Sequence, residues 1–192
     1  MLRALIVLAV VAVGLARGGA LRNFGALRLR LPGLAFAGLA IQVLIFTPLR
    51  GGLVDEAAIP AIYIVSMLLL VAWTALNRHL PGMLLMASGL LANTLAIAAN
   101  GGHMPAWPTA VRIAGREALY PDDASGVHLN SLATDEGVRL WLLTDIIPVP
   151  AWVPFANVFS IGDILLTVGV CVLCWRTLRV ERHAARVDTA AA

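Results

Sequence analysis

The chemically most informative residue is Asp163, a carboxylic acid inside an apolar stretch near the C-terminus. A charged side chain in a membrane-type helix costs on the order of 3 kcal/mol on insertion scales, so it normally faces other helices and has a partner. On a helix, Asn157, Ser160 and Thr167 share a face with Asp163, because residues three or four apart are neighbours. The spacing predicts a polar face directed toward other helices.

A second carboxylate, Asp145, stands 18 residues earlier, before a connector rich in proline. If the connector folds back, the two acids meet, and a pair that shares one proton can activate a water molecule. A structural interpretation is also open, in which Asp163 hydrogen-bonds Asn93 or Tyr63 and holds helices together. Asp145 then only caps a turn. The pair is therefore a candidate aspartyl dyad with a structural alternative.

A matching face of small and amide side chains runs along residues 80–99. Small residues let two helices approach closely, and asparagine hydrogen-bonds across such contacts. The sequence predicts that this face, residues 57–76 and the Asp163 helix meet around a polar centre nearer the outer surface. The stripe consists of Gly82, Gly89, Asn93, Ala96 and Asn100, and the predicted polar centre of Asn93, Asn100, Asp145, Asn157, Ser160 and Asp163.

The composition decides what kind of chain must position these groups. Of its 192 residues, 60% are hydrophobic and only 13% are charged, and the mean hydropathy is +0.87. Soluble domains usually contain about 25% charged residues. A soluble globular enzyme, a disordered chain and a nucleic-acid-binding domain are therefore excluded.

Five apolar stretches approach the ~20 residues that a helix needs to cross a bilayer core of ~30 Å. Two of them open with Leu-Pro-Gly, and proline is tolerated in a first helical turn. We expect an all-α polytopic membrane protein with five transmembrane helices in a single membrane domain, residues 1–192. The expected spans are residues 2–16, 31–49, 57–76, 80–99 and 155–175.

The arginines predict the orientation. They cluster in the loop after the first stretch, at Arg78, and after the last stretch. Short loops rich in arginine stay in the cytoplasm, which places the N-terminus outside and the C-terminus inside. The first stretch also resembles a secretory signal, so a cleaved signal with four spans is an alternative.

Membrane lipids are the expected partners, another membrane protein is a further candidate, and nucleic acid is not expected.

Residues 100–154 then form an extracytoplasmic cap between the fourth and fifth helices. Within it, Thr109–Leu119 predicts a short amphipathic helix, and Thr134 predicts the N-cap of a helix that runs to Leu143. The prolines between residues 148 and 154 exclude regular helix before the fifth span. The tryptophans of this segment indicate a packed lid.

Motifs for cofactors and metals are not recognisable. The chain has no Walker loop, dinucleotide fingerprint or Gly-x-Ser-x-Gly, so we expect no cofactor. Cys171 and Cys174 have redox spacing but lie in an apolar helix, where a thiolate is disfavoured. The histidines and Met104 of the cap match no known ligand spacing, so we expect no metal.

Five motifs along nearly the whole chain form a specific set. They are Arg-Gly-Gly-x-Leu-Arg-Asn (17–23), Leu-Pro-Gly-Met (80–83), Ala-Asn-Gly-Gly-His-Met-Pro (99–105), Arg-Leu-Trp-Leu-Leu-Thr-Asp-Ile-Ile-Pro-Val-Pro (139–150) and Asn-Val-Phe-Ser-Ile-Gly-Asp-Ile-Leu (157–165). The set resembles an uncharacterised family of small bacterial membrane proteins. The resemblance implies a bacterial cytoplasmic (inner) membrane and supplies no activity.

The segment before the last helix has a second resemblance. Thr144-Asp145-Ile146, an aromatic and proline-containing connector, and Phe159-Ser160-Ile161-Gly162-Asp163 follow one another. This order resembles the end of lipoprotein signal peptidase, in which two Asp residues form a protease dyad near the outer surface. The resemblance implies an aspartyl peptidase with Asp145 and Asp163 as the dyad. The chain departs from that family where Ser160 replaces an Asn and where Ala92-Asn93 lacks the family's Asp-Arg.

Three functional classes follow from these residues. The first is a non-catalytic assembly factor or accessory subunit whose acids hold the fold together. The second is an intramembrane aspartyl hydrolase, and the third is a small-molecule or lipid carrier. A groove open to lipid beside two close carboxylates favours the hydrolase, and a continuous polar path to Arg78 favours transport. A sealed and fully hydrogen-bonded cluster favours the structural role.

Overall fold

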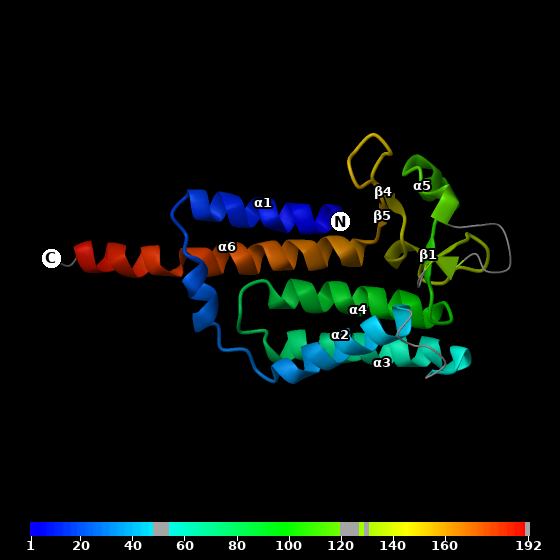
Figure 1. Ribbon diagram of the computed structural model, residues 1–192, viewed down its shortest axis with the longest axis horizontal. Coiled ribbons are helices and arrows are strands. Elements are labelled where there is room, and N and C mark those ends of the chain that lie inside the picture. Colours follow the sequence, from blue (N-terminus) through cyan, green and yellow to red (C-terminus); the bar gives the residue numbers. More distant parts are fainter. Residues whose placement is uncertain (48–53, 120–126, 129–130, 191–192) are drawn as a thin grey trace.

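The computed structural model describes residues 1–47, 54–119, 127–128 and 131–190. Five apolar helices lie side by side, and a cap of short strands and turns covers one end of them (Figure 1). In this bundle α6 packs against α1 on one side and α4 on the other, α3 packs against α4, and α2 packs against α3. The five helices are α1 (Leu2–Ala16), α2 (Pro32–Phe46), α3 (Ile59–Leu76), α4 (Met83–Ala99) and α6 (Ile161–Ala190).

The length of the helices bears on the expected spans. Two segments are long and apolar enough to cross a membrane, Glu56–Leu76 and Ile161–Arg179. The first of these joins the 3-10 turn η3 (Glu56–Ala58) to α3. Helices α1, α2 and α4 are apolar but shorter. The described residues thus form a mostly helical chain with features that favour a membrane location, and five complete spans stay a prediction.

Helix boundaries follow the local sequence. Helix α2 begins at Pro32, as its Leu-Pro-Gly motif predicts. The second such motif lies outside its helix, because Gly82 has a positive φ of 84° and α4 begins only at Met83. Part of the predicted span 31–49 falls on residues 48 and 49, which lie outside the described residues.

The last helix differs most from its predicted bounds of 155–175. It begins at Ile161 and continues to Ala190. The residues before it pair instead as a short ribbon, in which β4 (Ile147–Pro148) and β5 (Val158–Phe159) run antiparallel. The N–H of Val149 donates to the carbonyl of Asn157 at 2.9 Å, which holds the connector folded back on itself. The prolines of this connector exclude helix there, as expected.

Helices α4 and α6 approach each other through glycines. A Cβ atom added to Gly89 would lie 2.4 Å from the Gly162 carbonyl oxygen, and one added to Gly169 would lie 2.7 Å from the Gly82 carbonyl oxygen. No side chain fits between backbones at this distance. The predicted stripe of small residues on α4 therefore contacts a similar stripe on α6.

The loops that carry the arginines meet at the end opposite the cap. The side chain of Asn23, in the 3-10 helix η1 (Leu21–Ala26), donates to the carbonyl of Thr177 at 3.1 Å. The side chain of Asn77 donates to the carbonyl of Arg30 at 3.0 Å and accepts from its N–H at 2.7 Å. The first loop, the loop between α3 and α4, and the part of α6 around Thr177 therefore share one end of the bundle, and α6 continues beyond it (Figure 1).

The cap contains strands, so the all-α expectation fails in this segment. Strand β1 (Met104–Ala106) runs parallel to β3 (Ser131–Ala133), which pairs antiparallel with β2 (Val127–His128). Buried backbone in a loop needs hydrogen-bond partners, and short strands supply them without a helical sequence. The helical pieces of the cap are α5 (Pro108–Ile113) and the 3-10 turns η4 (Glu117–Leu119) and η5 (Trp141–Leu143).

The predicted helix from Thr134 to Leu143 is wrong. The hydroxyl of Thr134 accepts from the N–H of Glu136 at 3.1 Å, as an N-cap would. The chain then leaves helical geometry, because Gly137 and Leu140 have φ values of 64° and 53°. Only the 3-10 turn η5 remains. The helix predicted over 109–119 is likewise interrupted, at Gly115 with a φ of 63°.

Candidate functional site

Asp163 lies in the first turn of α6, where three helices contribute to one hydrogen-bonded cluster. Its Oδ1 atom accepts from Arg3 Nη1 of α1 at 2.5 Å and from Asn93 Nδ2 of α4 at 3.0 Å. The hydroxyl of Ser160 donates to Asn93 Oδ1 at 2.8 Å and accepts from the Asp163 N–H at 3.0 Å. The expected contact between Asp163 and Asn93 is therefore present.

Asp145 belongs to the cap, and its backbone is fixed from both sides. Its N–H donates to the carbonyl of Pro105, and its carbonyl accepts from the N–H of Trp107, both at 2.9 Å. These bonds attach Asp145 beside β1. The preceding residue, Thr144, is buried, and its hydroxyl donates to the Trp141 carbonyl at 2.7 Å. These bonds fix the backbone of Asp145 within the cap.

Both carboxylates line one cavity between the cap and the bundle. The cavity has a volume of 560 Å³ and includes buried Tyr63 in its wall. Asn157, a predicted member of the polar centre, also lines it. Arg116, which the sequence did not single out, lines it and donates from Nε to the Ala156 carbonyl at 2.7 Å. The polar lining residues are Arg3, Gln42, Tyr63, Asn93, Arg116, Asp145, Asn157 and Asp163.

The two carboxyl groups have different electrostatic surroundings. Burial raises the pKa of Asp145 well above its usual range, and the nearby negative charge of Asp163 raises it further. The positive charge of Arg3 opposes both effects in part. Asp163, in contrast, is 14% exposed and accepts from a guanidinium and an amide. The surroundings therefore favour the protonated form of Asp145 and supply cationic and amide donors to Asp163.

Arg3 is the cluster member that sequence reasoning missed. It forms an ion pair with Asp163 across 160 residues of sequence. Its guanidinium also lies over the Phe159 ring, 5.6 Å from the centroid. An arginine in the first turn of an apolar helix needs a counter-ion, and Asp163 is the acid at the same end. This need for a counter-ion was the signal in the sequence that could have identified Arg3 as a member of the cluster.

Asn100 stands apart from the other predicted members. It does not line the cavity. Its side chain donates to the carbonyls of Ala96 and Arg139 at 2.7 and 2.9 Å and accepts from the Arg139 N–H at 2.9 Å. These bonds join the end of α4 to the cap. Asn100 therefore positions the cap on α4 and lies outside the cluster that contains Asn93, Ser160 and Asp163.

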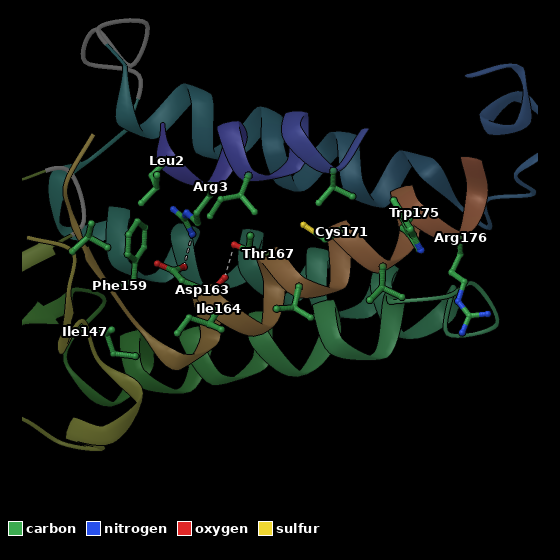
Figure 2. Close-up of a pocket in the computed structure, with 15 residues that line it drawn as sticks. Leu2, Arg3, Ile147, Phe159, Asp163, Ile164, Thr167, Cys171, Trp175 and Arg176 are labelled. Atoms are coloured by element: carbon green, nitrogen blue, oxygen red, sulfur yellow. Dashed lines mark hydrogen bonds and ion pairs between the residues drawn. The ribbon is translucent and has the colours of Figure 1, made fainter. Parts of the chain in front are cut away.

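A second, apolar cavity adjoins the first. It is a groove of 630 Å³ between α1 and α6 (Figure 2). Arg3 and Asp163 line both cavities and so form their boundary. Its far end is lined by Trp175 and Arg176. The carboxylate of Asp163 therefore stands between a polar cavity and an apolar groove.

These features define a class: a mostly helical protein with membrane-type helices and a polar cavity, containing two acids, beneath a cap. Residues 26–175 match DUF5317, a family of unknown function, and the chain belongs to this family. A protein of Thermotoga maritima described as uncharacterised is 31% identical over 113 residues, 58% of this chain and 61% of the relative. The chain thus spans about three fifths of the length of this relative. No solved structure matches the chain.

Proposed function

We propose that the chain is an integral protein of a bacterial inner membrane and hydrolyses a peptide bond with Asp145 and Asp163. Five apolar helices with their arginine-rich loops at one end support the membrane arrangement. The positive-inside rule puts that end in the cytoplasm and the N-terminus and the cap outside. Lipids are then the immediate surroundings of the bundle.

A single observation carries the hydrolytic proposal: two carboxyl groups from distant elements line one polar cavity. Their surroundings divide the roles of acid and base between them. Asp145, whose pKa is raised, is the protonated member and serves as general acid. Asp163 is the base, oriented by Arg3 and Asn93.

The reaction balances with one water molecule. Asp163 takes a proton from the water as its oxygen attacks the peptide carbonyl carbon, and Asp145 gives its proton to the carbonyl oxygen. When the tetrahedral intermediate collapses, that oxygen returns its proton to Asp145 and the C–N bond breaks. The leaving nitrogen takes the proton from Asp163. Both carboxyl groups are then restored, and no cofactor is required.

Binding of a transition-state analogue tests the proposal without a known substrate. We would titrate the detergent-purified protein with an apolar peptide that carries a statine hydroxyl and follow the melting temperature. The wild type is expected to bind it, and Asp145→Asn and Asp163→Asn to bind at least about tenfold more weakly. Asp135→Asn, an exposed acid of the same cap, is the matched control and should bind like the wild type. No binding to the wild type, or equal loss in the control, overturns the proposal.

A non-catalytic accessory role is the second candidate, and a different observation favours it. The bonds among Arg3, Asn93, Ser160 and Asp163 join α1, α4 and α6 at one point. If this cluster only holds the helices, Asp163→Asn should lower the melting temperature strongly, because a buried network then loses its charge. If Asp163 is catalytic, the melting temperature should stay or rise, because catalytic sites trade stability for function.

A further inference from the structure

The groove between α1 and α6 is closed at both ends by direct contacts. At the cap end, Arg3 bonds to Asp163. At the other end, a Cβ atom on Gly14 would lie 2.5 Å from Leu178 Cδ1, and the Ala20 N–H donates to the Leu178 carbonyl at 3.1 Å. The two helices are thus held together near each terminus of α1 and leave a slot between these points (Figure 2).

The slot suits a thin, apolar occupant. Its wall between the ends consists mainly of aliphatic side chains and includes Cys171, whose sulfur lies at the groove in Figure 2. A volume of 630 Å³ is within the range of about 300–1,000 Å³ that small-molecule sites have. A helix of another protein has a diameter of about 10–12 Å with its side chains and needs far more room. One extended hydrocarbon chain fits this shape.

The length of the slot agrees with an acyl chain. From Asp163 to Arg176 the axis of α6 advances about 20 Å, at 1.5 Å per residue. One leaflet contributes about 15 Å of hydrocarbon, half of the ~30 Å bilayer core. An acyl chain that starts at Arg176 would therefore lie along the slot and end near the polar cluster.

Arginines gather where such a lipid would place its head group. Arg176 lines the groove and is exposed. Next to it, Trp175 lies beneath two further guanidinium groups, those of Arg179 at 3.8 Å and Arg17 at 5.7 Å from the ring centroid. Guanidinium groups bind phosphate oxygens in pairs of hydrogen bonds, and tryptophan is typical of the membrane interface.

No acid balances these arginines among the residues whose side chains the structure describes. All the acids described lie in the cap or at the cap end of the bundle, Asp55 and Glu56 included. The two ends of the groove therefore differ in charge: Arg3 is neutralised by Asp163, and Arg176 faces no described carboxylate. This asymmetry favours an anionic head group at the Arg176 end and selects the leaflet on that side.

We propose that the groove binds one anionic phospholipid, with an acyl chain between α1 and α6 and its phosphate on Arg17, Arg176 and Arg179. The inference does not depend on the hydrolytic activity proposed above, because it uses the opposite end of the groove. It assigns a lipid class and a leaflet to a site in a protein whose expected partners were membrane lipids in general.

Native mass spectrometry of the detergent-purified protein tests the head-group contact. Dioleoylphosphatidylglycerol and dioleoylphosphatidylcholine are the probes, since they share acyl chains and differ in charge. We expect the wild type to bind the anionic lipid about tenfold more tightly, and Arg176→Gln to lose most of this preference. Arg28→Gln removes one exposed arginine from the same end but away from the groove, so it should keep the preference. Equal binding of both lipids by the wild type, or equal losses in both variants, overturns the proposal.

A pair of tryptophan substitutions tests the acyl slot. Val168 is 44% exposed and lines the groove, whereas Val65 is 53% exposed on α3 and does not. Val168→Trp should abolish the phosphatidylglycerol adduct, and Val65→Trp should retain it. Bound lipid should also slow the alkylation of Cys171 by N-ethylmaleimide severalfold, with buried Cys174 as the slow internal reference. Unchanged adducts in Val168→Trp, or a dimer in place of a lipid adduct, place the lipid outside the groove and refute the proposal.

Discussion

The two faces of α6 are built in opposite ways. Toward α4, glycines on both helices bring backbone against backbone, and Asn93 bonds to Asp163 where the contact ends. Toward α1, direct contacts hold each end, and a groove of 630 Å³ lies between the two helices. The same helix thus forms a closed contact on one side and an open one on the other.

This difference shows where the molecule is rigid and where it is available to ligands. A glycine contact has no side chain that can move, so any added atom displaces a backbone. The α1 side of α6 presents mainly isoleucine, valine, threonine and cysteine side chains to the groove, where a hydrocarbon neighbour can pack against them. Asp163 lies at the boundary of the two faces and is bonded to both helices.

The largest effect is expected from adding a side chain to the closed face. In Gly169→Leu, the new Cβ would lie 2.6 Å from Met86 Cγ and 2.7 Å from the Gly82 carbonyl oxygen. We expect a loss of about 3 kcal/mol in the free energy of unfolding, at the upper end of the usual range for overpacked cores. Thermal unfolding in detergent measures it. Val168→Leu, the adjacent residue on the open face, is the control, and equal stability of the two variants would contradict the comparison.

A smaller loss of stability is expected when the hydrogen-bonded cluster around Asp163 is changed. Asn93→Ala removes the amide that donates to Asp163 and accepts from Ser160. Leaving these groups without their partner should cost about 1–3 kcal/mol of unfolding free energy. Ser88→Ala, on the same helix, removes only an exposed hydroxyl that donates to the Leu84 carbonyl, so its effect should stay within about 0.5 kcal/mol. If both variants unfold at the same temperature, the cluster does not hold α4 to α6.

The smallest expected effect is a change of folding stability with pH. Because the pKa of Asp145 is raised in the folded state, the folded protein binds more protons than the unfolded chain above the ordinary pKa of about 3.9. This contribution to stability is present at low pH and is lost as the pH rises through the raised pKa. Melting curves between about pH 4 and pH 8 should therefore show that the stability of Asp145→Asn rises relative to that of the wild type as the pH increases. An Asp135→Asn control should follow the wild type, and a constant difference for Asp145→Asn would contradict the raised pKa.

The helices of the bundle were predictable because apolar stretches of this length have few alternatives. The stripe of Gly82, Gly89 and Asn93 also indicated which face of α4 contacts another helix, since helical periodicity places these residues together. The pairing of that face with the helix of Asp163 followed from the need of a buried acid for a partner. Membership of an uncharacterised family was also correctly inferred.

The cap was predicted less well. The N-cap signal at Thr134 is real, but positive φ at Gly137 and Leu140 ends the helix, and a non-glycine residue in that conformation gives no sequence signal. Strands of two or three residues are too short to produce an alternating pattern. Arg3 was missed for a different reason, because its partner is 160 residues away and local spacing cannot indicate such a contact.

The pairing of the first helix with the last has a consequence for the order of events during synthesis. Arg3 and Asp163 are 160 residues apart, so at about 5–20 residues per second the ribosome needs roughly 8–30 s to make the partner of Arg3. For that time α1 has neither its counter-ion nor the helix it packs against. Until then the guanidinium group of Arg3 needs water or another hydrogen-bond acceptor in place of Asp163. The fold becomes complete only when the last helix joins the first.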